Sequence, residues 1–534
     1  MANFFTAILT FFLTLFSVSV MSFITMAAPV GPWIDVTLVL LGMFLIKIFY
    51  RTLSPLKTTE ILGYSTAASA IGGSVATACG FAFPTLYFLQ PDLFMSLLHT
   101  PAMFVSLMAF MVLAAGGLGM LIAHVCAPVF LADATMSFPI GQMTYSLMSV
   151  SGSIKKAYEL IAGLCTAFVF SALQFFTTLV PKKIFLLQSR AISLWTLPHI
   201  LLRSEWILML VAIGFVTGHV IAVPLAIGVL IKFLAADPIH QNFFCDLAAD
   251  DFFFAFCSGI VLQSTFMSLI ELPQYIYKFF KSGSGKRLNL AEYVSLTTFQ
   301  GLVLGGFFVS TMLFLWYLKF SFVSQAYLLV FTALCTYQIA IIGGKAGLAP
   351  VGRFATWVMV PFLMLFGLDP LQITVVATFV EISGMVVVDA LFGRKMAQLA
   401  HLDTRKVICY QIAGLVVSSL LVGIIFWLLI SYFGLGAASP LIAQRCQARA
   451  LLINASHFDY IVMLIGIACG FGLKYIKINS TLVLGGLLLP IDFSLLLIVG
   501  GLATYLVKDR EEYVPFWSGV FAASALFMLL KTLF

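Results

Sequence analysis

The stretch Ser65–Leu89 reads STAASAIGGSVATACGFAFPTLYFL and contains no charged residue. It combines small residues with a proline at position 84, a composition typical of a helix that packs closely against other helices inside a bilayer. Lipid cannot hydrogen-bond the backbone groups that a proline frees, so neighbouring helices or a watery cavity must satisfy them. Interrupted segments of this kind surround the substrate sites of transporters.

The composition of the whole chain also indicates a membrane protein. Of its 534 residues, 62% are hydrophobic and only 9% are charged, which excludes a set of ordinary soluble domains. The net charge of +7 is small for this length, and the basic residues lie mostly between apolar runs, so we expect no nucleic-acid partner. The nine cysteines form no CxxC motif, so neither a disulfide framework nor a metal site is expected.

Apolar runs follow one another along almost the entire chain. A helix needs about 20 residues to cross a bilayer core of about 30 Å, and some of the runs are shorter or contain Pro and Gly. We therefore predict an all-α polytopic membrane protein with about 12–16 transmembrane helices, some of them broken. The candidate runs are 4–27, 33–50, 66–89, 102–131, 158–180, 206–218, 219–235, 252–272, 293–318, 323–342, 353–366, 371–393, 407–432, 459–473, 480–506 and 513–532.

The segments between the runs are short and leave no room for a large soluble domain, which favours a carrier in the inner membrane of a bacterium. The longest polar stretches, which we expect to be loops, are 181–205, 278–292, 394–406 and 434–457. The first run lacks a basic leader, so we expect it to be retained as a spanning helix. Basic residues in some connecting segments indicate cytoplasmic loops, and both termini are then expected in the cytoplasm. These residues are Arg51, Lys57, Lys278, Lys281, Lys286, Arg287, Arg394, Lys395, Arg405 and Lys406.

Two pairs of short motifs indicate an internal repeat. The motif IGFVTG at 213–218 is echoed by IGIACG at 465–470, and acidic pairs at 250–251 and 511–512 are each followed by Ser-Gly, at 258–259 and 518–519. Because the echoes occur in the same order at nearly the same spacing, we predict two homologous halves, 1–285 and 286–534. An even number of crossings in each half gives both halves one orientation, whereas an odd number inverts them.

A set of short motifs rich in small residues and proline runs over most of the chain, at 58–60, 67–74, 83–84, 138–141, 213–218, 485–490 and 500–501. Together they resemble the oligopeptide transporter family, which includes yellow-stripe-like carriers of metal chelates. The chain lacks the family's acidic motif beginning Asn-Pro-Gly and has Tyr145–Leu147 where the family places an acidic residue. The resemblance implies a secondary transporter of small oligopeptides or peptide-like metal chelates, coupled to protons by symport, without a cofactor.

Two carboxylates lie within one apolar run, 371–392. A charge at bilayer depth costs about 2.5–3.5 kcal/mol, so Glu381 and Asp389 each need a partner or a function. On a helix they lie about 80° apart and about 12 Å apart along the axis, and we expect them to face one cavity at two depths. A desolvated carboxylate takes up a proton readily, which proton coupling requires. The alternative is structural: Asp389 approaches Arg394 at the interface, and Glu381 hydrogen-bonds to a neighbouring helix.

The segment GGKAGLAPVGR at 343–353 joins two apolar runs. Its glycines and proline favour a backbone that unwinds at membrane depth and presents amides and positive charge to a substrate carboxylate. A cytoplasmic turn with positive-inside residues is the alternative interpretation. The substrate-binding candidates here are Gly343, Gly344, Lys345, Pro350 and Arg353.

Two further interrupted segments are expected. One contains Phe138, Pro139, Gly141 and Gln142 and follows Asp133; the other contains Phe83–Pro84. Proline removes a backbone donor, and glycine relieves the crowding that follows, so both are candidates to line a substrate site.

Histidines and glycines in apolar surroundings complete the candidate residues. His124 and His219, with Asp133, are candidates for proton coupling, although a lone membrane histidine more often hydrogen-bonds between helices. The GxxxG pairs Gly214/Gly218 and Gly466/Gly470 are expected to pack helices closely rather than to contact a ligand.

Two other classes of protein remain as alternatives to a transporter. An intramembrane lipid-processing enzyme needs a catalytic constellation, and neither HExxH nor a nucleophile elbow occurs, so we do not expect an enzyme. A passive channel needs a ring of subunits or a repeated filter sequence, and none is recognisable. The oligomeric state cannot be inferred from the sequence.

Overall fold

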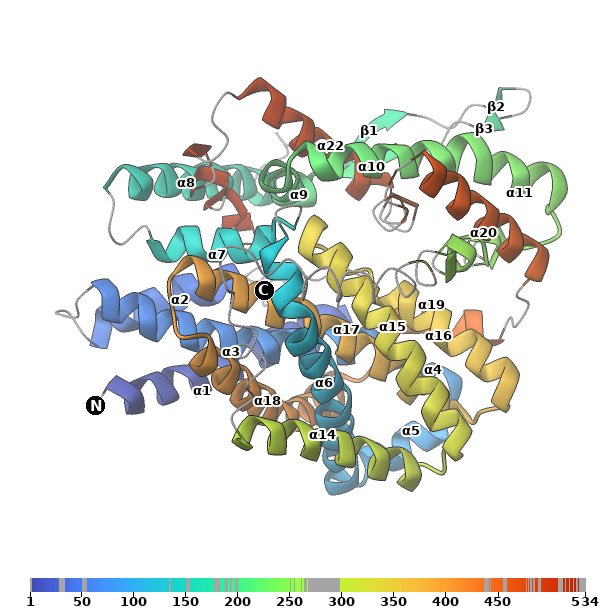
Figure 1. Ribbon diagram of the computed structural model, residues 1–534, viewed down its shortest axis with the longest axis horizontal. Coiled ribbons are helices and arrows are strands. Elements are labelled where there is room, and N and C mark those ends of the chain that lie inside the picture. The colour runs from blue at the N-terminus through green and yellow to red at the C-terminus, as the bar shows by residue number, and fades with distance from the viewer. Residues whose placement is uncertain are drawn as a thin grey trace, which may run out of the picture.

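The computed structural model of the chain is almost entirely helical over the residues that it describes (Figure 1). The described residues are 2–27, 34–49, 55–133, 136–149, 154–176, 183–187, 191–192, 195–196, 200–249, 251–253, 255–260, 262–263, 267, 298–436, 441, 443–454, 459–476, 478, 480, 483, 486–487, 491–507, 512–513, 515–517, 519–521, 523–524 and 527.

Most helices of the first half overlap the predicted apolar runs, whereas three short ones, at 91–98, 139–149 and 237–243, lie outside those runs. They are α1 (Ala2–Ala27), α2 (Asp35–Phe49), α3 (Pro55–Ala82), α4 (Thr85–Leu89), α5 (Pro91–Leu98), α6 (Pro101–Ala132), α7 (Pro139–Ser149), α8 (Ile154–Phe176), α9 (Ser204–Thr217), α10 (His219–Ile231) and α11 (Asp237–Phe243), with a π-helical turn at Lys232–Ala236.

The second half contains a 30-residue helix, Pro370–Leu399, that is buried along most of its length. Its elements are α14 (Thr298–Tyr317), α15 (Phe322–Ala346), α16 (Val351–Phe366), α17 (Pro370–Leu399), α18 (Thr404–Phe433), α19 (Gln444–Asn454), α20 (Tyr460–Tyr475) and α22 (Ile491–Ala503), followed by a 3-10 turn at Thr504–Leu506.

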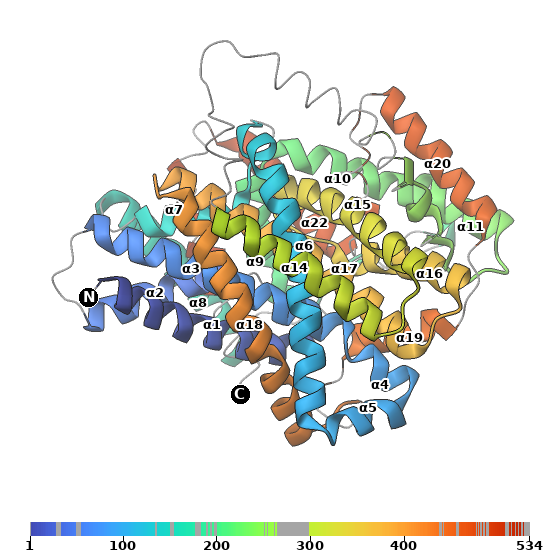
Figure 2. The same ribbon diagram turned by 60° about the horizontal axis from the view of Figure 1, so that its bottom comes forward.

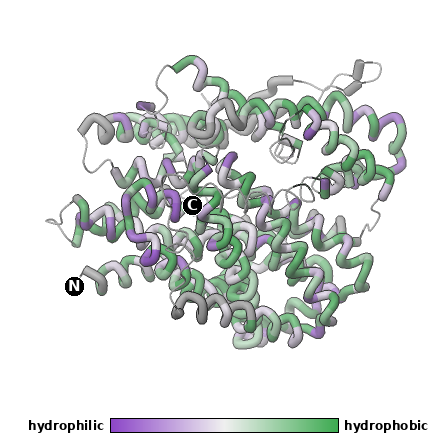
Figure 3. Tube along the Cα trace, viewed as in Figure 1, coloured by the Kyte–Doolittle hydropathy of each residue, from purple (hydrophilic) through white to green (hydrophobic). Residues whose placement is uncertain are grey.

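Within the described residues, seven helices are long and apolar enough to cross a membrane, which confirms an all-α membrane protein. Hydrophobic residues extend along most of the helices (Figure 3). Shorter apolar helices, such as 351–366 and 460–475, occur as well. The seven spans are 4–26, 56–89, 101–132, 222–243, 322–346, 370–399 and 404–433.

Helix α18 shows how the surface suits lipid. Large apolar side chains recur at every fourth residue of one face and are 41–82% exposed. A continuous apolar stripe of this kind on a surface marks contact with a membrane or a partner. The stripe consists of Val416, Leu420, Ile424, Leu428 and Tyr432.

Helices α3 and α17 form the centre of the helical assembly (Figures 1 and 2). Helix α17 packs against α3, α6, α7, α15 and α16, and α3 packs against α1, α2 and α18. Small residues allow this close approach: a Cβ at Gly414 of α18 would lie only 2.2 Å from the carbonyl oxygen of Ala68. The close packing that the small residues of Ser65–Leu89 predict is therefore confirmed at Ala68.

The GxxxG prediction is confirmed at three of its four glycines. A Cβ at Gly214 would lie 2.3 Å from the Leu497 carbonyl oxygen of α22, and one at Gly466 would lie 2.1 Å from that of Phe256. At Gly470, a Cβ would meet the Gln263 side chain at 2.8 Å. These glycines pack helices from the two predicted halves against each other.

Three segments expected to be polar loops contain regular structure. Within 181–205, β1 (Lys183–Leu187) pairs antiparallel with β4 (Ile200–Arg203), and β2 (Ala191–Ile192) with β3 (Trp195–Thr196). The predicted start of the loop 394–406 is wrong, because α17 continues to Leu399 and Arg394 is only 2% exposed. The segment 434–457 contains α19.

Candidate functional site

Two of the predicted interruptions meet in the interior. Helix α6 ends at Ala132 and α7 begins at Pro139, while α15 ends at Ala346 and α16 begins at Val351. The Phe138 amide donates a 2.7 Å hydrogen bond to the Gly344 carbonyl oxygen. The Ser137 hydroxyl donates to the Lys345 carbonyl oxygen at 3.3 Å. The two interruptions therefore form hydrogen bonds with each other that lipid could not provide.

The contact between these interruptions depends on unusual backbone conformations. Phe138 has φ +44°, a region that non-glycine residues rarely adopt. Gly347 has φ +67°, and a Cβ there would lie 2.6 Å from Cγ of Pro139. A Cβ at Gly344 would lie 3.0 Å from the Phe138 ring. Strained residues that the surrounding structure enforces are typical of functional sites.

The unwound part of 343–353 is shorter than the sequence predicts. Gly343, Gly344 and Lys345 belong to the last turn of α15, and Arg353 lies in the first turn of α16, so only 347–350 is non-helical. Gly343 is helical and packs closely against α17, because a Cβ there would lie 2.7 Å from the Val388 side chain.

The other predicted residues of these segments lie around the contact. The half-buried Lys345 interacts electrostatically with Asp133, the residue that follows α6. Pro350 immediately precedes α16. On α7, Gln142 is half-buried, and a Cβ at Gly141 would lie 2.7 Å from the Phe392 carbonyl oxygen. Gly141 is therefore a close-packing residue.

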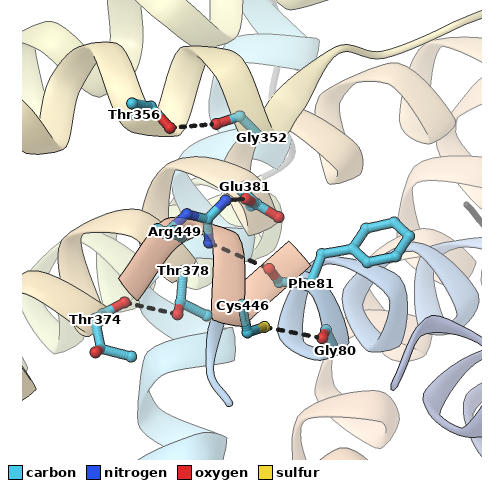
Figure 4. A network of polar contacts seen from close by, with 9 residues as sticks. All are labelled: Gly80, Phe81, Gly352, Thr356, Thr374, Thr378, Glu381, Cys446 and Arg449. Carbon is cyan, nitrogen blue, oxygen red and sulfur yellow. Dashed lines mark hydrogen bonds and ion pairs between the residues drawn. The ribbon is translucent and has the colours of Figure 1, made fainter. Parts of the chain in front are cut away.

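Glu381 forms a buried ion pair with Arg449 of α19 (Figure 4). The Glu381 side chain is fully buried, and that of Arg449 is 6% exposed. Arg449 also donates from Nη1 to the Phe81 carbonyl oxygen at 3.2 Å. The second carboxylate oxygen of Glu381 has no hydrogen-bond partner among the described residues.

A third interruption supplies the backbone groups of this site. Pro84 has no N–H to donate to the Gly80 carbonyl oxygen four residues earlier, and the Cys446 thiol approaches that oxygen at 3.5 Å. The end of α3 thus presents two carbonyl groups to α19 (Figure 4). The interruption at Phe83–Pro84 is confirmed, and Arg449 satisfies part of its freed backbone.

A second arginine of α19 adds positive charge. The Arg445 guanidinium lies 4.0 Å from the centre of the Phe81 ring. Burial lowers the pKa of Arg445 to about 10 against the opposing effect of Glu381, so the side chain remains charged at neutral pH. Glu381 thus interacts electrostatically with two guanidinium groups, of which Arg449 is the ion-pair partner. The N-terminus of α16 lies beside the pair, since a Cβ at Gly352 would be 3.5 Å from Oε1 of Glu381.

Sequence reasoning missed α19, because Gln444–Asn454 has the polar composition of a loop. The spacing of Arg445 and Arg449 by four residues, on one face of a helix, is the signal that was available. Neither side chain has a nearby acidic residue in the sequence, which indicates a partner from another segment.

Asp389 belongs to a separate polar cluster. It accepts a hydrogen bond from the Ser74 hydroxyl of α3 and is 1% exposed. Two turns separate it from Glu381, so the two carboxylates contact different surroundings rather than each other. Arg394, which the structural alternative places near Asp389, donates from Nε to the Gln411 side-chain oxygen at 3.3 Å.

The histidines are placed as follows. His124 is half-buried on α6 and interacts electrostatically with Arg394. His219 begins α10, and its side chain lies outside the described residues. Proton coupling at either histidine stays a prediction.

Comparison with known proteins adds no assignment. No protein-family model matches the chain, and no curated protein matches it significantly. The resemblance to oligopeptide transporters therefore remains an inference from the motifs.

Proposed function

We propose that the protein is a secondary active transporter of small oligopeptides or peptide-like metal chelates, driven by symport with protons. Two observations carry this proposal. Interrupted helices meet in the interior at Phe138 and Gly344, and the buried Glu381–Arg449 pair lies against the end of α3 and the start of α16. Interrupted helices with charged partners in the bundle interior are typical of transporter substrate sites. The membrane is proposed to be the inner membrane of a bacterium.

The charges beside Glu381 favour a substrate with a carboxylate. Arg445 and Arg449 carry positive charge, and the first amides of α16 lie nearby. Guanidinium groups and helix N-termini are preferred partners of carboxylates. A peptide C-terminus or an acidic chelate supplies such a group.

Transport requires that this site open alternately to each side of the membrane. The contact between Phe138 and Gly344 closes the two interruptions on each other, and we propose that it separates during transport. A substrate can drive the change only by binding the two states with different affinities.

The glycine contacts support an arrangement in two related halves. Helix α9 packs on α22 through Gly214 and Gly500, and α10 packs on the 483–487 segment through Gly228 and Gly486. A further contact joins 255–260 to α20 through Gly466. This reversed order of partners is what a two-fold relation between 1–285 and 286–534 produces.

Uptake into proteoliposomes tests the function. A panel of labelled tripeptides and iron or nickel chelates is offered to vesicles with and without an inward proton gradient. We expect at least one compound to accumulate above its outside concentration only when the gradient is present.

Other outcomes identify the alternatives. Equilibration without accumulation under any gradient indicates a channel, and chemical conversion of an added lipid indicates an enzyme. Equal accumulation with and without the proton gradient contradicts the coupling but not the transport.

A further inference from the structure

A second buried carboxyl group accompanies Asp389. Asp35 is the first residue of α2 and is 4% exposed, and its carboxyl acts electrostatically on that of Asp389. Oδ2 of Asp35 and Oδ1 of Asp389 have no hydrogen-bond partner among the described residues. Buried polar atoms are nearly always satisfied, so two orphan carboxyl oxygens in one cluster indicate a ligand.

The packing of α1, α2 and α3 builds the surroundings of this pair. A Cβ at Gly73 would lie 2.5 Å from the Ser17 hydroxyl and 2.6 Å from Cγ2 of Ile34. The absence of a side chain at Gly73 therefore brings α1 and the residue before Asp35 against α3, next to Ser74. The Ser17 hydroxyl also lacks a partner in the described part of the chain.

The charged groups on the neighbouring helices interact elsewhere. On α17 itself, Glu381 pairs with Arg449, and Arg394 donates to Gln411 of α18. On α6, His124 interacts with Arg394, and at the end of α15, Lys345 interacts with Asp133. The described groups that act on Asp389 are Asp35 and Ser74, a carboxyl and a hydroxyl.

We propose that Asp35 and Asp389, with the Ser74 hydroxyl, bind one exchangeable cation, a proton or Na⁺. Two neighbouring carboxylates in a low-dielectric interior cannot both stay ionised without compensation. A single positive charge held between them removes the repulsion and satisfies the orphan oxygens. Carboxylate and hydroxyl oxygens are ligands that hard cations prefer. The site is separate from the arginines of α19, and it does not depend on the transport proposal, because binding is measured without substrate.

The first experiment tests Na⁺ directly. Binding of ²²Na⁺ to the purified full-length protein is measured at pH 8 and compared with that of Asp35→Asn and Asp389→Asn. Asp369→Asn, at the exposed start of the same helix, is the control. Saturable binding by wild type and the control, with at least a tenfold loss of affinity in both test variants, assigns Na⁺.

The second experiment tests the proton. Thermal unfolding midpoints are measured from pH 5 to 8 in choline chloride. If only the folded protein holds the proton, its stability falls as pH rises, because the unfolded carboxyls are already ionised above about pH 5. We expect the wild-type midpoint to fall and the Asp389→Asn midpoint to fall less, since Asn resembles a protonated Asp.

The two measurements together decide the proposal. A midpoint of the wild type that responds neither to pH nor to Na⁺, in the absence of ²²Na⁺ binding, overturns it. So does a response that Asp35→Asn and Asp389→Asn share fully with wild type. Ser74→Ala, which keeps both carboxyls, serves as a third variant if either Asn variant fails to fold, and it is expected to weaken the response.

Discussion

A buried ion pair such as Glu381–Arg449 is costly to form and more costly to break. The desolvation free energy of the two buried charges offsets most of their Coulomb attraction, so the pair adds little net stability. Removing one partner leaves the other charge buried without compensation. The pair is therefore better explained by a function that needs charge at this depth than by stability.

We predict that Arg449→Met destabilises the protein by about 3–5 kcal/mol, because it removes the ion-pair partner of the buried Glu381 carboxylate. The double variant with Glu381→Gln should recover much of this loss. Thermal unfolding in detergent provides the measurement, with Arg405→Met on the exposed start of α18 as the control. Equal destabilisation in the single and double variants is the opposing result.

Transport kinetics test the coupling role of Glu381. We predict that Glu381→Gln loses proton-driven accumulation but retains exchange of substrate across the membrane, because Gln cannot bind and release a proton. Glu60→Gln is the control, since Glu60 is partly exposed and pairs with Lys406 at 3.8 Å. Unchanged accumulation in Glu381→Gln would show that the residue only packs.

At the residue scale, the sequence revealed one member of each buried cluster. Glu381 and Asp389 were recognisable because each interrupts an apolar run. Their neighbours Arg449 and Asp35 were not, because the first lies in a polar segment and the second at the edge of an apolar run. Contacts between residues so distant in sequence follow from packing alone.

At the scale of helices, a break occurs in or beside each segment where the sequence predicts one: at 83–84, just before Pro139 in the segment 138–142, and at 347–350 within 343–353. Proline and glycine predicted them because their backbone constraints act locally. Local constraints cannot predict which interruptions meet, so the contact of Phe138 with Gly344 was not foreseen. The short strands between 183 and 203 and the extension of α17 to Leu399 were also missed.

Two glycines that end helices give a matched test of that contact. Gly347 and Gly367 both have positive φ, of +67° and +57°, but only Gly347 has an atom near its absent Cβ. We predict that Gly347→Ala costs about 1–3 kcal/mol more than Gly367→Ala, because the added methyl meets Pro139. Thermal unfolding of both variants decides the matter. Equal losses would mean that the contact contributes nothing.

Helix α20 offers a similar comparison for helix packing. A Cβ added at Gly466 would lie 2.1 Å from the Phe256 carbonyl oxygen, whereas one added at Gly472 would have no atom within 4 Å. We expect Gly466→Ala to lower the unfolding midpoint and Gly472→Ala to leave it unchanged or slightly raised, since Ala favours helix. A tolerated Gly466→Ala would contradict the close packing of α20 against 255–260.

At the scale of the molecule, hydropathy predicted an all-helical membrane protein with most of its helix positions, and the seven long apolar helices agree with that prediction. The apolar stripe of α18 shows the reason: residues that face lipid need only be apolar, so composition identifies them. The arrangement of helices around α17 requires specific contacts, which composition does not encode.

The central claim is that the interrupted segments line a site that water reaches during transport. Ser137→Cys, at the interruption before α7, and Leu420→Cys, on the lipid-facing stripe of α18, are compared in proteoliposomes. The background carries alanine at the exposed Cys165, Cys245 and Cys409. We predict that a membrane-impermeant maleimide labels Ser137→Cys at a rate that depends on the proton gradient and leaves Leu420→Cys unlabelled. Labelling of Ser137→Cys no faster than that of Leu420→Cys, under either gradient, would contradict the claim.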